Sequence, residues 1–253
     1  MIRSILFQAS YWIVSIFFAL AAAPLLLVPD RRPIASWIRL YARAMRALMR
    51  WVAGVRVVVN GRERAPEGPA IIAAKHQSWG DGFIMMSEFP DLAVVAGDHL
   101  DRFPLVGGIL RKMGAIVVDN CGGAFARAKL VDEELARAAG EGRSVLIYPE
   151  GHLAPVGARH RYKKGVFHMY AAYGRPALPV ATNLGLFWSQ QSWRLRPGIA
   201  TVELLTPIEP GLGKEAFMSR LEDEIERASL RLAGREIAES APLAPPLPDP
   251  VEA

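Results

Sequence analysis

The chain of 253 residues contains a single cysteine, Cys121. A disulfide within the chain and a cysteine-based zinc cluster are therefore excluded, and a reducing compartment is consistent with this composition. Cys121 follows Asn120 and has no base close to it in the sequence, so we expect it to be structural. The sequence also lacks a Gly-x-Ser-x-Gly motif and a cluster of metal ligands, so we expect neither a covalent serine intermediate nor a metal cofactor.

Charged residues are absent from Ser4 to Pro29. This apolar run is longer than the roughly 20 residues that cross the core of a bilayer. It continues from Leu25 to Val28, beyond the small residues Ala21 to Ala23 at which a secretory signal would be cleaved. We therefore expect a membrane segment that is retained in the protein.

The whole chain is both apolar and basic, with 51% hydrophobic residues and a formal net charge of +5. This combination favours an anionic membrane surface as a partner. Nucleic acid would also suit a basic protein, but the sequence has no zinc-finger spacing, no aromatic RNA-binding motif and no basic helix before a heptad repeat. We therefore expect membrane lipids as partners and no nucleic acid.

A second helix is predicted after the turn at residues 29–33, running to Val52. One face carries an arginine stripe, and the other is apolar and rich in aromatic residues, which suits the headgroup boundary. Packing of the same helix on the rest of the protein is the alternative. The stripe is Arg39, Arg43, Arg46 and Arg50, and the apolar face is Trp37, Tyr41, Ala44, Leu48 and Val52.

Positive charge after the apolar run outweighs Arg3 before it. A true span would therefore leave the rest of the chain on the cytoplasmic side of a bacterial-type inner membrane. A hairpin that dips into one leaflet is equally allowed, and Pro24 and the turn bounded by prolines favour the hairpin.

Short β-rich runs alternate with helical segments through the remainder of the chain, which predicts an α/β fold. We expect a membrane element at 1–53, an α/β domain at 54–236 and a proline-rich tail at 237–253. Strands are predicted at 55–59, 69–74, 92–96, 115–118, 144–148, 177–181 and 200–205. Helices are predicted at 81–87, 105–113, 125–139, 165–172 and 214–232.

The segment Lys75–Gly82, which reads KHQSWGDG, follows the apolar strand predicted at 69–74. Loops beyond strand ends commonly hold reactive groups. His76 and Asp81 do not share a face of a regular helix, but a turn that leads into a helix can bring the carboxylate to one imidazole nitrogen. Such a pair can act as a general base, although the spacing alone fits a structural histidine and a capping aspartate as well.

Five segments in order resemble the glycerolipid acyltransferase family, which includes bacterial 1-acylglycerol-3-phosphate acyltransferases. The hallmark of that family, a His, four residues and an Asp, matches His76 and Asp81, and Lys75 stands where many relatives have Asn. The resemblance covers roughly Ile71 to Leu205. The other segments are GAIVVDN at 114–120, YPEGHL at 148–153, YKKG at 162–165 and ALPV at 177–180.

This resemblance implies a mixed sheet flanked by helices and an O-acyltransferase of phospholipid biosynthesis. It implies that His76 removes a proton from a lysolipid hydroxyl while Asp81 orients its ring, with acyl-CoA or acyl-carrier protein as co-substrate and no cofactor. The residues expected to bind substrate are Glu150, Gly151, Lys163, Gly114, Asn120 and His152.

The chain departs from the family at the acceptor site, because two arginines of the family motifs fall on Asn120 and Leu153. Arginine is the usual bidentate ligand of phosphate. Other basic residues can bind the phosphate of 1-acylglycerol-3-phosphate, which would give phosphatidate, or the acceptor can carry another headgroup, as in a lyso-ornithine lipid. A membrane-attached lipid-binding protein without turnover is the third alternative.

Overall fold

Four consecutive apolar residues form the central strand β2, Ile71–Ala74, and all four are buried. A strand that is covered on both faces needs apolar side chains at every position, and this explains the unbroken run. The computed structural model, which describes residues 1–97, 104–118 and 124–234, builds a seven-stranded sheet around β2.

The sheet has the strand order β1-β7-β6-β2-β5-β3-β4. All neighbouring pairs are parallel except β6 and β7, which are antiparallel, so the expected mixed sheet is confirmed. Because five strands share one direction, the chain after β2 and the chain after β5 leave the sheet at the same edge. The remaining strands are β1 Val55–Asn60, β3 Ala93–Gly97, β4 Ile116–Val118, β5 Val145–Ile147, β6 Ala177–Thr182 and β7 Gly198–Leu204.

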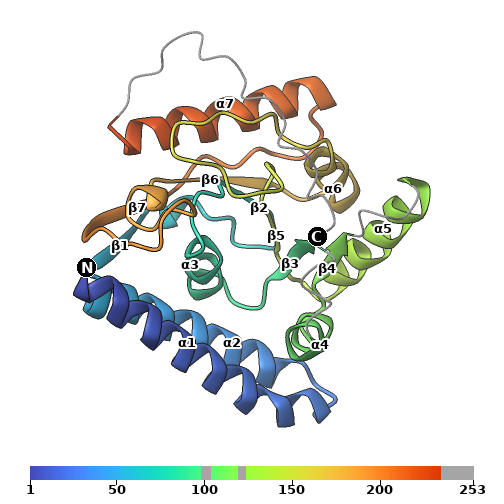
Figure 1. Ribbon diagram of the computed structural model, residues 1–253. Helices are drawn as coiled ribbons and strands as arrows, with labels where there is room; N and C mark the ends of the chain where they lie inside the picture. Colours follow the sequence, from blue (N-terminus) through green and yellow to red (C-terminus); the bar gives the residue numbers. More distant parts are fainter. Residues whose placement is uncertain (98–103, 119–123, 235–253) are drawn as a thin grey trace.

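Helices cover both faces of the sheet, as Figure 1 shows. Ile71 and Ala73 of β2 pack into the core on the face of α5, α6 and α7, whereas Ile72 and Ala74 pack into the core on the face of α1 and α3. The first group consists of α5 Ala124–Gly140, α6 Gly165–Tyr173 and α7 Lys214–Leu232, and the other group of α1 Ile2–Ala22, α2 Arg32–Leu48 and α3 Asp81–Glu88. Shorter elements are α4 Pro104–Lys112, η1 Ala23–Leu27, η2 Met49–Ala53, η3 Arg62–Arg64 and η5 Leu184–Leu186.

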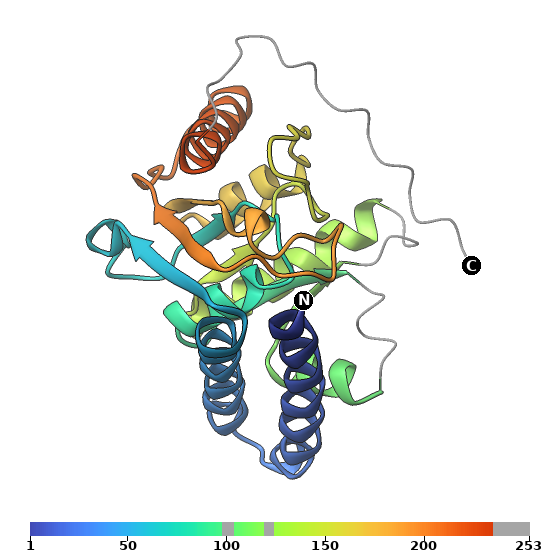
Figure 2. The same cartoon turned by 60° about the vertical axis from the view of Figure 1, so that its left-hand side comes forward.

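The helices α1 and α2 form an antiparallel hairpin beneath the sheet (Figure 2). Trp37 Nε1 donates a hydrogen bond to Phe18 O at 2.9 Å, and Tyr41 OH lies 2.8 Å from Ser15 Oγ. Tyr41 also contacts the ring of Phe83 in α3. The aromatic face of the second helix is therefore half-buried against α1 and α3, as the alternative of packing on the rest of the protein predicts, and its binding at the headgroup boundary stays a prediction.

Both ends of the hairpin's apolar segment are attached to the α/β domain. Near its start, Leu195 N donates to Ser4 Oγ at 3.1 Å, and beyond its end Lys112 Nζ donates to Pro29 O at 3.0 Å. Arg31 in the turn forms an ion pair with Asp91. The segment thus runs along the domain and does not project away from it.

One side of α1 is an apolar surface exposed to solvent. Residues 2–27 form a helical segment with a mean hydropathy of 2.0, long and apolar enough to cross a membrane by length and composition. Exposed side chains recur every three or four residues, so they form one stripe along the helix. The exposed side chains are Ile2, Ile5, Leu6, Trp12, Ile13, Ile16, Phe17 and Leu20.

Each strand and helix predicted between residues 55 and 232 is present, with bounds that differ by two residues or fewer. The second predicted helix differs, because its α-helical part ends at Leu48 and a π-helical turn continues to Ala53. Gly54, in the left-handed conformation, then ends the helix. The domain boundaries stay predictions, and the tail at 237–253 lies outside the described residues.

Candidate active site

The loop after β2 brings His76 and Asp81 together. Asp81 is the first residue of α3, and its Oδ2 lies 3.1 Å from His76 Nδ1. The same oxygen accepts hydrogen bonds from the backbone N–H groups of Gln77 at 2.7 Å and Ser78 at 2.8 Å. Because one carboxylate oxygen holds both the loop backbone and the imidazole, the position of the ring is fixed relative to α3.

An ionised aspartate can only accept hydrogen bonds, so its contact assigns the imidazole proton to Nδ1. The lone pair then resides on Nε2, the nitrogen that a general base uses. The His76 ring stacks on Tyr148, with 4.0 Å between the ring centroids and 19° between the planes. The side chain of His76 remains 22% exposed, so a substrate hydroxyl can approach it.

A buried charged cluster lies directly behind His76. Glu150 Oε2 accepts a hydrogen bond from His76 N at 2.8 Å, and Glu150 Oε1 forms an ion pair with Lys75 Nζ at 2.6 Å. Lys75 Nζ also lies 2.6 Å from Glu226 Oε1 in α7, which accepts a hydrogen bond from Tyr162 OH at 2.9 Å. The backbone of the candidate base is thus attached to the C-terminal helix through three ionisable side chains.

The charges in this cluster stabilise one another. Burial acts to lower the pKa of Lys75, but the carboxylates of Glu150 and Glu226 outweigh it and raise this pKa above its ordinary value. Burial also raises the pKa of Glu150 above its ordinary value, because it outweighs the opposing effects of Lys75 and the His76 N–H. Lys75 therefore remains a cation, and its contact with Glu150 opposes protonation of the carboxylate that accepts from the loop.

Gly151 and Lys163 lie next to this cluster. Gly151 has a φ of +72°, a left-handed conformation that glycine adopts without strain. A Cβ atom there would lie 2.7 Å from Lys163 Cε, so the lysine side chain runs across the glycine. Lys163 Nζ has no carboxylate within 4.0 Å among the described residues, which leaves this cation available for an anionic substrate group.

His152 lies on the same loop, which is attached to His76 by a hydrogen bond of 2.7 Å from Ala154 N to His76 O. Its ring meets that of His160 edge-on, with 4.6 Å between the centroids. Burial and the neighbouring His160 lower the pKa of His152, which favours its neutral form. Within the described part of the chain, the Nε2 atoms of both rings are buried and lack a hydrogen-bond partner.

Gly114 is not brought to His76. It precedes β4, at the edge of the sheet where the parallel strands begin, whereas His76 follows the end of β2. Its φ is +62°, and a Cβ atom there would lie 2.9 Å from guanidinium nitrogens of both Arg137 and Arg143, which gives a structural reason for glycine. The placement therefore does not support substrate contact by Gly114, and Asn120 lies outside the described residues.

Sequence reasoning missed three side chains of this site. Tyr148 was part of a matched segment, but nothing in the pattern indicated that it stacks on His76. Tyr162 likewise belonged to a matched segment without a stated role. Glu226 gave no signal, because it belongs to a helix of mixed charge and lies 151 residues from Lys75 in the chain.

The family model described as Acyltransferase matches residues 56–183, just over half of the chain and the part that contains this loop. The chain belongs to the acyltransferase family. A 1-acyl-sn-glycerol-3-phosphate acyltransferase of Pseudomonas aeruginosa is 32% identical over 200 residues, covering 78% of this acyltransferase and 74% of the relative. One from Cocos nucifera is 28% identical over 67% of the chain and 55% of the relative.

Two further similarities complete the comparison. The crystal structure of a 1-acyl-sn-glycerophosphate acyltransferase from Thermotoga maritima superposes with a TM-score of 0.74 at 20% identity, covering 93% of this acyltransferase and 98% of that chain. At this identity it supports the fold. A lyso-ornithine lipid O-acyltransferase of Pseudomonas aeruginosa is 27% identical over 47% of this chain and 49% of its own. The protein is thus an O-acyltransferase of lipid metabolism.

Proposed function

We propose that this acyltransferase transfers a fatty acyl chain from a thioester donor to the free hydroxyl of 1-acylglycerol-3-phosphate, forming phosphatidate. The hydrogen bond between His76 and Asp81 is the observation that carries the proposal, because it gives a general base its orientation at the end of a central strand. The names of the relatives in Pseudomonas aeruginosa and Cocos nucifera support the acceptor.

In the proposed mechanism His76 Nε2 takes the proton of the acceptor hydroxyl as its oxygen attacks the thioester carbonyl. Asp81 stabilises the imidazolium that forms. The tetrahedral intermediate then collapses, the C–S bond breaks, and the proton on His76 neutralises the departing thiolate. The new ester and the free thiol balance the hydroxyl and thioester that are consumed. A general base of this kind contributes roughly 10²–10⁴-fold to rate.

The donor in this proposal is acyl-CoA or acyl-carrier protein, and no cofactor takes part. The chemistry requires only a base and an activated acyl group, because the thiolate of the donor is itself a good leaving group. In the described ranges, no group of three or more His, Cys, Asp or Glu side chains is arranged to hold a metal ion.

The catalytic assignment is tested with purified protein, a labelled thioester donor and 1-acylglycerol-3-phosphate. We expect His76→Ala to lower kcat/KM by roughly 10²–10⁴-fold, since the general base is removed. His168→Ala is the matched control, because His168 is an exposed residue of α6 whose Nε2 lies 2.8 Å from Asp132 Oδ1 of α5. Full transfer by His76→Ala would refute the mechanism, and a protein that binds lysolipid without forming product would be a lipid-binding protein.

Acceptor recognition in this proposal rests on Lys163 beside Gly151. If the phosphate binds there, Lys163→Met raises the KM for the acceptor and leaves the KM for the donor nearly unchanged. Lys164→Met is the matched control, since Lys164 is the next residue, is also exposed and carries the same charge. Equal effects of the two substitutions, or an equal effect on both substrates, would contradict a phosphate site at Lys163.

A lysolipid with a different headgroup, such as a lyso-ornithine lipid, is the second candidate acceptor. Leu153 is buried and apolar where the family has an arginine, and one relative carries this activity in its name. A panel of lysolipid acceptors distinguishes the two candidates. Faster transfer to lyso-ornithine lipid, together with no effect of Lys163→Met on the KM for that acceptor, would select it.

We further propose that the hairpin lies in one leaflet, with the domain on the cytoplasmic side of an inner membrane. Because Ser4 and Pro29 both contact the domain, the two ends of the apolar segment lie on the same side. A span would separate these ends by the roughly 30 Å of the hydrocarbon core. An N-terminal tag should therefore be accessible to protease from the cytoplasmic side, and protection of the tag would indicate a span.

A further inference from the structure

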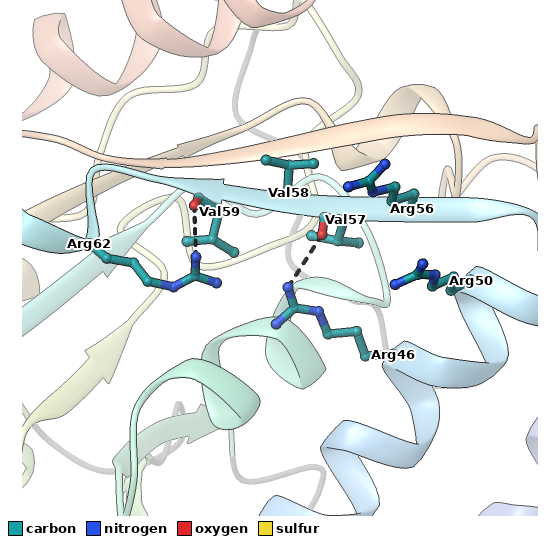
Figure 3. Close-up of a pocket in the computed structure, with 7 residues that line it drawn as sticks. All are labelled: Arg46, Arg50, Arg56, Val57, Val58, Val59 and Arg62. Carbon is teal, nitrogen blue, oxygen red and sulfur yellow. Dashed lines mark hydrogen bonds between the residues drawn. The ribbon is translucent and has the colours of Figure 1, made fainter.

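A pocket of about 260 Å³ lies between the end of α2 and the edge strand β1 (Figure 3). Arginines dominate its lining. Two come from the helical segment, one from β1 and one from the short turn η3. Arg46, Arg50 and Arg62 lie on one side of β1, and Arg56 lies on the other side of this edge strand with Val58 (Figure 3). The lining residues are Arg46, Arg50, Arg56, Val57, Val58, Val59 and Arg62.

Two of these arginines are held in place by the protein. Arg46 pairs with Glu88 and donates to Val57 O at 3.3 Å. Arg62 donates to Glu88 Oε2 at 2.7 Å and to Val59 O at 3.0 Å, and Figure 3 marks both bonds to the strand carbonyls. Burial acts to raise the pKa of Glu88, but hydrogen bonds from Arg62 and Arg46 outweigh it and lower this pKa, so Glu88 stays ionised.

The other two arginines have no carboxylate partner among the described residues. Neither Arg50 nor Arg56 has a carboxylate within ion-pair distance in the part of the chain that the structure describes, and both are exposed. Glu88 contacts only Arg46 and Arg62, so four lining guanidinium groups are accompanied by one carboxylate, a formal excess of three positive charges. Guanidinium groups bind phosphate in a bidentate geometry, so the pocket suits a phosphate group.

We propose that this pocket binds the headgroup phosphate of an anionic membrane phospholipid, at a site separate from the active site. Trp51 selects a lipid as the source of the phosphate. Its ring is stacked under the Arg50 guanidinium at 4.7 Å, and its side chain is 75% exposed. An exposed tryptophan beside arginine is typical of the bilayer interface, where the ring contacts acyl chains and the cation contacts headgroups.

The site is distinct from the catalytic loop because the helix α3 separates them. Asp81, which holds His76, begins α3, and Glu88, which holds Arg46 and Arg62, ends it. Eight helical residues span about 12 Å. The bound lipid would therefore anchor the end of α3 opposite the active site, and it is not the acceptor substrate.

The test compares binding of the purified full chain to vesicles of phosphatidylcholine with and without phosphatidylglycerol. We expect phosphatidylglycerol to strengthen binding to the vesicles. Arg50→Gln/Arg56→Gln should remove most of this increase, because each arginine lost should weaken the affinity for these vesicles by roughly 5-fold. The matched control is Arg32→Gln/Arg43→Gln, which removes the same charge from exposed positions of α2 outside the pocket. Transfer activity in detergent should be unchanged in both variants.

If the two double variants weaken vesicle binding equally, the proposal is overturned. Such a result would show that the anionic membrane attracts the positive charge of the whole hairpin and that no dedicated site exists. Glycerol 3-phosphate and inorganic phosphate serve as soluble competitors. Release of the protein from vesicles by either one at millimolar concentration would show that the pocket binds free phosphate in preference to a lipid. If the double variant does not fold, the single change Arg56→Gln, on the edge strand, should still lower the gain by roughly 5-fold, and an unchanged gain would overturn the proposal.

Discussion

Removal of the buried positive charge behind the active site should destabilise the whole protein. The side chain of Lys75 is 1% exposed, and its Nζ lies 2.6 Å from carboxylate oxygens of both Glu150 and Glu226. Lys75→Met keeps nearly the same length but leaves two buried carboxylates without a cation. Breaking a buried ion pair by removal of one partner costs about 3–5 kcal/mol.

For a domain of this size, each kcal/mol corresponds to about 2–4 °C in Tm, so Lys75→Met should lower Tm by roughly 6–20 °C. The measurement is thermal unfolding in detergent, followed by circular dichroism. Lys129→Met is the control, because Lys129 is 70% exposed and pairs only weakly with Glu133, at 4.0 Å. Its Tm should change by about 1 °C or less.

A second variant tests the cause of this effect. Lys75→Met/Glu226→Gln removes one of the two unpaired carboxylates, so it should recover part of the lost Tm, and the double-mutant cycle should show coupling. A Tm of Lys75→Met within about 2 °C of the wild type would refute the reasoning, since it would show that the carboxylates are protonated or solvated at no cost. Additive effects of the two substitutions would likewise contradict a shared ion pair.

Three further changes have defined outcomes. Gly151→Ala places a Cβ at a φ of +72° and against Lys163, so it should lower stability by about 1–2 kcal/mol and raise the KM for a phosphate-bearing acceptor. An unchanged KM would show that Lys163 does not bind the acceptor. Asp81→Asn should lower kcat by roughly 10²–10⁴-fold while the fold remains, because the amide no longer selects the tautomer of His76, and retained kcat would exclude that role. Because the folded pKa of Glu88 is lowered, its contribution to stability is present above about pH 4.3 and is lost as the pH falls through the folded value. Glu88→Gln should therefore reduce the dependence of the free energy of unfolding on pH in this acid range. An unchanged dependence would contradict the ion pairs of Glu88.

Local sequence signals predicted the secondary structure well. Val55–Asn60 is a β-rich run that ends in Asn60-Gly61, and Ile71–Ala74 is one that polar residues follow. Both signals depend only on neighbours in the chain. The second helix was less well described. Its spacing identified an apolar face correctly, but spacing does not show whether lipid or α1 covers that face. Contact of Tyr41 with Ser15 and Phe83 depends on tertiary packing.

The site could be predicted only as far as its motif extended. His76 and Asp81 are five residues apart, so a turn suffices to join them. The position of Gly114 depends on which end of its strand faces the loop, and the motif carries no such information. The cluster around Lys75 depends on a residue in the last helix, and no pattern near Lys75 indicates a partner at that distance.

The ion pair between Lys75 and Glu226 also has a consequence for biosynthesis. Glu226 follows Lys75 by 151 residues, so a chain still emerging from the ribosome contains the His76 loop long before it contains the counterion from α7. During most of translation the loop lacks the contact that fixes its lysine. The order of synthesis thus delays completion of the catalytic centre until the final helix has been made, by which time the N-terminal hairpin has long been free to reach the bilayer.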